Sequence, residues 1–125
     1  KFRKNIKYFN NKNMAEKKYD LEERTAKFGE NIIVFVKKIK RDIYNESTIK
    51  QLIRSATSIG ANYREANGGS SPKDFKNKVH ICQKETKETK YWLQILGKSN
   101  SEIIEETRTL WKEAHEFTLI FGKII

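Results

Sequence analysis

Several charged side chains lie beside apolar positions in the middle of the sequence, where they could do chemistry. Glu85 and Glu88 are a close pair of carboxylates in such a setting, and paired carboxylates can transfer protons or bind two metal ions. A di-metal site in a four-helix protein also needs a histidine three residues after a glutamate, and neither glutamate provides one. We therefore expect Glu85 and Glu88 to form ion pairs with arginines rather than a di-iron site.

The other candidate catalytic groups are dispersed along the chain. His80 and His115 are isolated, and Cys82 lies on an apolar helical face, as expected of a small core residue. The sequence contains neither the spacing of zinc ligands nor that of a phosphate-binding loop. It therefore predicts a protein that is not an enzyme, with no catalytic residues, no cofactor and no bound metal.

Arginines and glutamates beside apolar faces are expected to hold helices or subunits together. Arg24, Arg54 or Arg64 is expected to supply the partner of the two central carboxylates. The predicted structural or interface polar network consists of Arg24, Arg54, Arg64, Glu65, Glu85, Glu88 and Trp92. The small residues that dominate positions 55–61 allow another helix to approach closely, either within the fold or across a subunit boundary.

Four amphipathic helices are predicted to carry these residues. Apolar residues recur three and four positions apart in each of them, and no alternating strand pattern competes. Ser71 followed by Pro72 is a strong helix start, and Gly97 together with Ser99 and Asn100 is expected to end the helix that begins there. The predicted helices cover about 21–40, 47–66, 72–96 and 100–121. Short loops between them predict an all-α fold, an antiparallel up-down four-helix bundle.

The length of the chain suits a single domain. Its 125 residues can bury one core, so we assign residues 21–125 to the four-helix bundle. Residues 1–20 lack a sustained helical period and are rich in Asn and Lys, which predicts a basic mobile N-terminal arm. Met14 is the only methionine, so residues 1–13 are either part of the protein or an extension upstream of its natural start.

Cysteine content and hydropathy bear on the cellular location. A single cysteine cannot form an internal disulfide, which suits a reducing compartment. No apolar run approaches the ~18 residues that a membrane span needs, and no signal-peptide pattern opens the chain. We therefore expect a cytoplasmic protein with no membrane partner.

The chain is strongly basic, with a formal net charge of +10. Five basic residues precede Met14 without an acid, which leaves 21 basic and 16 acidic residues and a net charge of +5 for residues 14–125. A basic surface favours polyanions because binding releases counterions, and nucleic acid is the commonest such partner. A solvated lysine-rich surface is the alternative, and charge alone does not decide between them.

One side of the third predicted helix concentrates basic residues. When residues are placed at about 100° per position, a stripe next to the apolar face contains no acid. This stripe consists of Lys76, His80, Gln83, Lys87, Lys90 and Gln94, with Lys73 extending it. The predicted nucleic-acid-binding residues are Lys73, Lys76, Lys87 and Lys90. A solvated helix face without a ligand is an equally open interpretation.

Four motifs, taken in order, resemble one protein family. They are Leu21-Glu22-Glu23-Arg24-Thr25-x-x-Phe28, Gln51-Leu52-x-Arg54-Ser55-Ala56-x-Ser58-Ile59-Gly60-Ala61-Asn62-Tyr63-Arg64-Glu65-Ala66, Ser71-x-x-Asp74-Phe75 and Lys84-Glu85-x-x-Glu88-Thr89-x-Tyr91-Trp92-Leu93. Through them, residues 20–121 are similar to the bacterial four-helix-bundle proteins encoded within 23S ribosomal RNA intervening sequences. The resemblance implies a small α-helical protein that assembles as a ring-like homopentamer and is not an enzyme.

The resemblance extends to a second group of proteins. This sequence also differs from the family pattern in two places. The accessory variability proteins of diversity-generating retroelements are similar in fold and quaternary form, and they bind nucleic acid and a reverse transcriptase. The segment before Met14 lies outside the family pattern, and Thr86 stands where many relatives have a small apolar residue. The resemblance gives none of the motif residues a catalytic or binding role, so they are interpreted as structural.

These observations lead to two principal hypotheses about function. The first is a non-enzymatic, homo-oligomeric nucleic-acid-binding protein, with RNA favoured by the resemblance and binding largely independent of sequence. The alternative is a ring-shaped interaction scaffold, or an accessory subunit for a protein partner such as a reverse transcriptase. A structural bundle with no partner is a third possibility.

Overall fold

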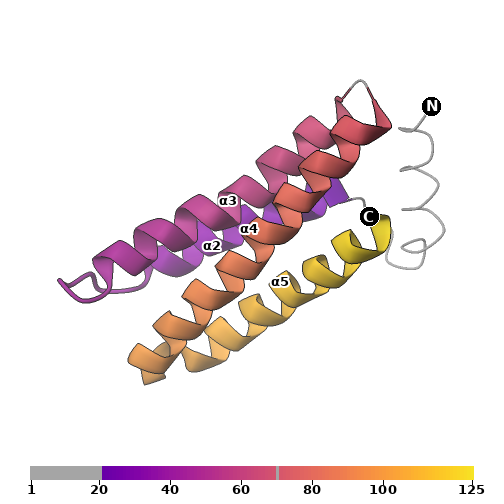
Figure 1. The fold of residues 1–125 in the computed structure, drawn as a ribbon. Coiled ribbons are helices and arrows are strands. Elements are labelled where there is room, and N and C mark those ends of the chain that lie inside the picture. The colour runs from indigo at the N-terminus through magenta and orange to yellow at the C-terminus, as the bar shows by residue number, and fades with distance from the viewer. Residues whose placement is uncertain (1–20, 70) are drawn as a thin grey trace.

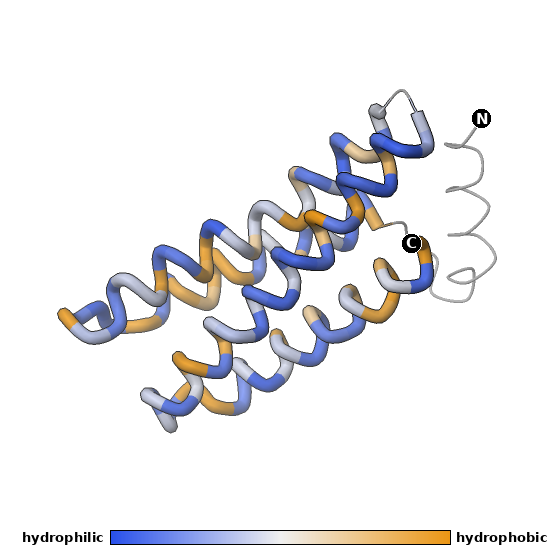
Figure 2. Tube along the Cα trace, in the orientation of Figure 1, coloured by the Kyte–Doolittle hydropathy of each residue, from blue (hydrophilic) through white to orange (hydrophobic). Residues whose placement is uncertain are grey.

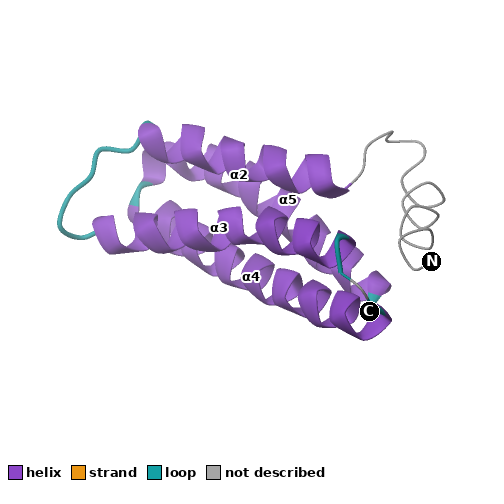
Figure 3. Cartoon of the chain, turned by 90° about the horizontal axis from the view of Figure 1, so that it is seen from above, coloured by secondary structure: helices purple, strands orange, loops and turns teal. Residues whose placement is uncertain are grey.

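The computed structural model describes residues 21–69 and 71–125, so the predicted N-terminal arm lies outside the described residues. Within them the fold is all-α and has no strand (Figure 1). The helices are α2 (Leu21–Lys37), α3 (Glu46–Asn67), α4 (Pro72–Ser99), the short 3-10 helix η1 (Ser101–Ile103) and α5 (Ile104–Ile124). Consecutive long helices run in opposite directions (Figures 1 and 3). The predicted all-α fold of four helices is confirmed.

Helix α4 occupies the central position in the contacts between helices. It lies between α3 and α5 and packs along both of them (Figure 1). Helix α2 packs most closely against α3, and its backbone comes near that of α5 at few positions. The closest packing therefore runs from α2 through α3 and α4 to α5, and a groove follows the edge between α2 and α5.

Helix α2 ends at Lys37 rather than near residue 40, and the backbone N–H groups of Lys38 and Ile39 donate to carbonyls three residues back at 3.1 Å, in a tight final turn. Side chains organise the loop that follows. Asn45 Oδ1 accepts a hydrogen bond from the Asp42 backbone N–H at 2.9 Å, and Asp42 Oδ1 accepts one from the Asn45 N–H at 2.9 Å. Such side-chain contacts with the backbone compete with helix continuation. The loop thus has a structure of its own and leads directly into α3 at Glu46.

Helix α4 ends at the predicted Ser99–Asn100 stop and not at Gly97. The helix continues to Ser99, and Asn100 Nδ2 then donates to the Leu96 carbonyl at 3.0 Å. Gly97 is buried, and a Cβ atom there would lie only 3.0 Å from Thr107 Cγ2 of α5. The glycine therefore makes room for a neighbouring helix instead of terminating its own.

The apolar faces of all four helices meet in one core. Figure 2 shows apolar and polar residues alternating along each helix, as amphipathic packing requires. The largest fully buried side chains are Tyr63, Phe28, Phe117, Phe121, Leu21, Ile32, Ile49, Leu52, Ile59, Leu93, Leu96 and Val79. Because each helix also has a polar face, none within residues 21–69 and 71–125 is apolar enough over its length to cross a membrane.

Several buried polar side chains fit this core because their polar atoms are satisfied locally. The hydroxyls of Thr25 and Thr86 each donate to a carbonyl one turn earlier, at 2.6 Å. Thr86, which departs from the family pattern, therefore fits a fully buried position. Cys82 is also fully buried, and this burial raises the pKa of its thiol to about 12. The cysteine remains protonated and acts as the small core residue that the sequence predicted.

Helices α2 and α3 approach closely at the small residues of α3. A Cβ atom on Gly60 would lie 3.2 Å from Thr25 Oγ1 and 3.4 Å from the Ala26 backbone nitrogen. Gly29 of α2 faces Thr57 across the same contact. The small residues predicted to admit another helix therefore admit α2 within the chain itself.

We expect Gly60→Val to destabilise the protein, because the added atoms meet the backbone of α2, which cannot rotate away. Overpacking of this kind costs about 1–3 kcal/mol, which should lower the midpoint of urea unfolding followed by circular dichroism. Ala61→Val is the matched control, since Ala61 is exposed and the substitution adds a β-branched residue to the same turn of the same helix. Equal midpoints for the two variants would contradict the close contact at Gly60.

Candidate functional site

A polar cluster joins α3 to α4 at the residues that looked most capable of chemistry. Arg54 Nη1 donates to the two carboxylate oxygens of Glu85 at 3.3 and 3.4 Å, and Arg54 Nη2 donates to Glu88 Oε2 at 2.6 Å. Trp92 Nε1 donates to the same Glu88 oxygen at 3.1 Å. Of the three arginines considered from sequence, Arg54 is therefore the one that pairs with these carboxylates.

This cluster holds fixed charges and lies at the edge of the α3–α4 contact. The Arg54 side chain is 46% exposed and that of Glu85 is 11% exposed, so the arginine covers a nearly buried carboxylate from the solvent side. The hydrogen bonds from Arg54 and then from Trp92 lower the pKa of Glu88 below its ordinary value of 4.5. Both partners of the Arg54–Glu88 pair stay charged at neutral pH, which suits helix pairing rather than proton transfer.

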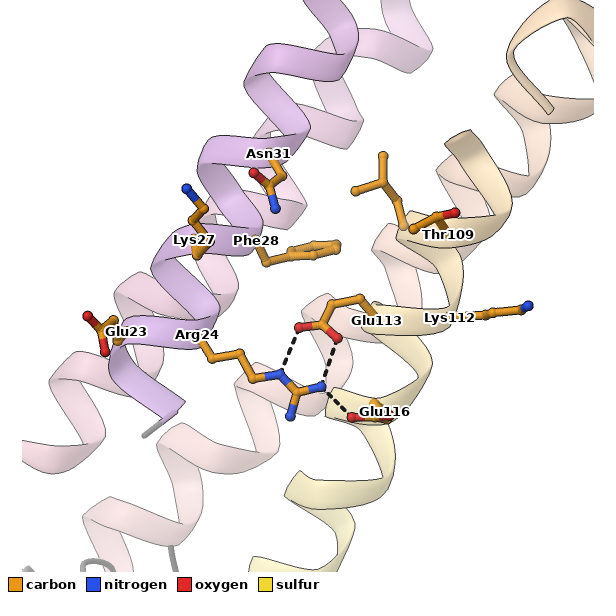
Figure 4. Close-up of a pocket in the computed structure, with 10 residues that line it drawn as sticks. Glu23, Arg24, Lys27, Phe28, Asn31, Thr109, Lys112, Glu113 and Glu116 are labelled. Atoms are coloured by element: carbon orange, nitrogen blue, oxygen red, sulfur yellow. Dashed lines mark hydrogen bonds and ion pairs between the residues drawn. The ribbon is translucent and has the colours of Figure 1, made fainter. Parts of the chain in front are cut away.

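Arg24 belongs to a separate cluster, across the groove between α2 and α5. Its Nε and Nη2 atoms donate to the two carboxylate oxygens of Glu113 at 2.7 Å, and Nη2 also donates to Glu116 (Figure 4). The guanidinium carbon lies 4.9 Å from the centroid of the Phe117 ring. With its side chain 9% exposed, Arg24 bridges two helices whose backbones approach each other at few positions. It pairs with α5 rather than with the carboxylates of α4.

The groove between α2 and α5 has a volume of about 760 Å³ and a lining of mixed character. Its walls are formed by Glu23, Arg24, Lys27, Phe28, Asn31, Thr109, Leu110, Lys112, Glu113 and Glu116. Figure 4 shows the Phe28 ring pointing into the space between the two helices. Charges of both signs alternate with apolar groups, and the Glu113 carboxylate is already paired with Arg24. The groove is therefore an open surface without a convergent set of reactive groups.

The last two members of the predicted network, Arg64 and Glu65, make exposed contacts. Arg64 Nε lies 3.8 Å from Glu22 Oε1 of α2, and Lys78 Nζ of α4 donates to Glu65 Oε1 at 2.7 Å. The residues predicted as one network thus lie in separate clusters, each of which joins different helices. The α5 carboxylates of the Arg24 cluster were not predicted from sequence, although their spacing of three residues beside the apolar face of that helix was a usable signal.

The four lysines predicted to bind nucleic acid lie on two sides of α4. Lys73, Lys76 and Lys87 are exposed. Lys90 faces α5, where its Nζ atom lies 3.0 Å from His115 Nδ1 and 4.9 Å from the centroid of the Trp111 ring. The ammonium group of Lys90 therefore takes part in the α4–α5 contact, while the other three lysines share a surface.

That surface is a continuous row along α4, because residues three and four positions apart lie on one side of a helix. We define the exposed face of α4 as Lys73, Lys76, Asn77, His80, Lys84, Lys87, Tyr91, Gln94, Ile95 and Lys98, all of which are exposed. It contains five lysines, and the exposed acid of α4 lies beside its start, at Asp74 in the first turn. Lys84, Tyr91 and Lys98 are absent from the nucleic-acid-binding residues predicted from sequence, because the predicted basic stripe lies next to the apolar face of the helix. A stripe directly opposite the apolar face would have included all three.

The similarity to known proteins agrees with this fold. The profile of the 23S rRNA-intervening sequence protein family matches residues 17–123. The chain belongs to this family. Membership confirms the resemblance seen in the four motifs and assigns a role to none of their residues. A search of curated proteins gave no match.

A solved structure extends the comparison to three dimensions. It is the crystal structure of a protein with unknown function from the S23 ribosomal protein family of Bacteroides thetaiotaomicron VPI-5482. The two chains are 32% identical and superpose with a TM-score of 0.74, and the match covers 83% of this chain and 96% of that chain. The four-helix arrangement is therefore shared between the two proteins over most of their lengths.

The described residues of this protein do not form a metal site. No group of three or more His, Cys, Asp or Glu side chains is close enough to hold a metal ion within residues 21–69 and 71–125. The structure instead brings together ion pairs between helices and a basic face on α4. The basic face differs from the ion pairs because its residues are exposed to solvent instead of covered by another helix.

We expect the Arg54–Glu88 pair to make stability depend on pH. A lowered pKa means that Glu88 stabilises the fold above its ordinary pKa and loses this contribution as pH falls through the lowered value. Glu88→Gln should therefore be less stable than wild type at neutral pH and should lose less further stability on acidification. Thermal unfolding between about pH 7 and pH 3 measures this difference. Glu105→Gln, at an exposed carboxylate of α5, is the control and should follow the wild-type profile.

Proposed function

We propose that this protein is a non-enzymatic RNA-binding protein that contacts the phosphate backbone through the exposed face of α4. The observation that carries this proposal is the row of five exposed lysines along a helix of 28 residues, with no exposed acid on that helix beyond its first turn. At about 1.5 Å per residue, such a helix is roughly 40 Å long, which spans several phosphates of a nucleic acid. Lysine is a point charge that recognises phosphate without reading base edges, so binding is expected to be largely independent of sequence.

The distribution of charge around α4 supports the same conclusion. The carboxylates of Glu85 and Glu88 face α3, where Arg54 neutralises them. They therefore do not oppose a polyanion on the other side of the helix. The family name, 23S rRNA-intervening sequence protein, favours RNA over DNA as the polyanion.

The proposal includes a homo-oligomer, for which a pentameric ring is the form that the family resemblance implies. Five copies of residues 14–125, each with a net charge of +5, would together carry +25. Weak contacts from separate subunits would then act together on one long RNA, because the second contact becomes intramolecular once the first has formed.

We expect the combined substitution of Lys76, Lys84 and Lys87 by Gln to weaken RNA binding and its dependence on salt. For each phosphate of a single strand that the variant no longer neutralises, the slope of log affinity against log salt should fall by about 0.7. Three substitutions should therefore reduce the slope by about 2. Fluorescence anisotropy with a labelled RNA over a range of salt concentrations gives both the affinity and the slope.

The matched control replaces three exposed lysines outside α4, Lys37, Lys40 and Lys123, by Gln. It changes the net charge by the same amount, so it separates a defined surface from diffuse attraction. If affinity and salt slope decrease equally in the two triple variants, or decrease in neither, the assignment to the exposed face of α4 is wrong. Light scattering on both variants shows whether each retains the wild-type oligomer.

A second candidate function is an accessory subunit for a protein partner such as a reverse transcriptase. The observation that favours it is the groove between α2 and α5, where the half-buried Leu110 offers an apolar contact among charges of both signs. Affinity capture from native lysate, with and without ribonuclease, separates the two functions. Recovery of one defined protein that resists ribonuclease would favour the accessory subunit, whereas recovery of partners only through RNA would favour direct RNA binding.

A further inference from the structure

An exposed aromatic ring interrupts the lysines of the α4 face. Tyr91 is 54% exposed and follows Lys87 by one helical turn, and Lys98 follows it by two turns. Ile95, 37% exposed, lies one turn beyond Tyr91 and enlarges the apolar spot. A simple phosphate-binding surface needs neither group, so the spot indicates a ligand that presents an apolar face together with its phosphates.

The polar cluster between α3 and α4 supports the Tyr91 ring. Tyr91 and Trp92 pack edge to face, with their ring centroids 4.8 Å apart and their planes at 68°. Trp92 in turn donates to Glu88 at 3.1 Å, and Glu88 accepts from Arg54 of α3 at 2.6 Å. These contacts hold the Tyr91 ring in a fixed orientation at the surface. A braced ring loses little conformational freedom when a ligand stacks on it.

The chemistry of this surface distinguishes the two forms of RNA. In a duplex the base faces are stacked on one another and only phosphates and sugars reach a convex helix surface, whereas a single strand can turn a base outward onto an aromatic ring. The lysines before and after Tyr91 could contact the phosphates on either side of a base that stacks on the Tyr91 ring. A duplex could contact the lysines, but it would present no base face to Tyr91.

We propose that the exposed face of α4 binds single-stranded RNA, with a base stacked on Tyr91 and the neighbouring phosphates on Lys84, Lys87 and Lys98. This inference rests on the proposed RNA-binding function and narrows it to a class of RNA. Since every base has a π face, the stacking adds preference for single strands without adding preference for sequence.

The test compares Tyr91→Ala and Tyr91→Phe with wild type on a labelled oligouridylate and on an RNA duplex of the same length. Tyr91→Ala should weaken binding of the single strand roughly 5- to 150-fold and leave duplex binding unchanged. Tyr91→Phe keeps the ring and should retain single-strand affinity. An oligomer of abasic nucleotides, which has phosphates without bases, should bind wild type and Tyr91→Ala equally.

Other outcomes overturn the inference in distinct ways. An unchanged affinity of Tyr91→Ala for oligouridylate, combined with weaker binding by the lysine triple variant, would leave RNA binding in place and exclude stacking on Tyr91. Equally weakened binding of single strand and duplex would also exclude it. A change in oligomer mass for Tyr91→Ala, measured by light scattering, would assign the tyrosine to a contact between protein chains. Failure of wild type to bind either RNA would overturn this inference and the proposed function together.

Discussion

The structure depends on the close packing of α4 against helices on both of its sides. Small and polar residues make this approach possible. Thr89 and Ser55 lie opposite each other with their hydroxyl oxygens 2.9 Å apart, and Gly97 accommodates Thr107 where a Cβ atom would crowd it. The hydroxyls of Ser55 and Thr89 are tolerated in the core because each lies within hydrogen-bonding distance of the other hydroxyl and of a carbonyl of its own helix. A larger residue at these positions would push α3 or α5 away from α4.

This packing also sorts the charges of α4. The carboxylates of Glu85 and Glu88 lie toward α3, where Arg54 covers them, and Lys90 lies toward α5, where it contacts His115. Beyond the first turn of α4, the exposed ionisable side chains of this helix are basic or neutral. The same helix can therefore hold the bundle together and present a basic surface, because the acids that would weaken that surface are used between helices. The ion pairs and the basic face are two consequences of one arrangement.

Ionic contacts have a different role at the α2–α5 edge. There the helix backbones approach each other at few positions, so side chains make the contact. Arg24 forms a bidentate pair with Glu113, and the rings of Phe28 and Phe117 pack edge to face. The guanidinium is nearly buried beside Phe117, so this pair is more strongly constrained than the exposed pair of Arg64 with Glu22. It contributes geometric specificity, because a fork of two parallel hydrogen bonds fixes the relative orientation of the two helices.

The amino-acid sequence by itself determined the four helices, the all-α fold and the family, because helical periodicity and turn residues act over a few neighbouring positions. It also indicated that Cys82 is a core residue and that Glu85 and Glu88 need an arginine. Only the tertiary structure decided which arginine that is, that Gly97 packs rather than terminates, and that Lys90 belongs to the α4–α5 contact. These outcomes depend on which helix lies opposite each side chain, and residues far apart in the chain establish that relation only when the helices pack.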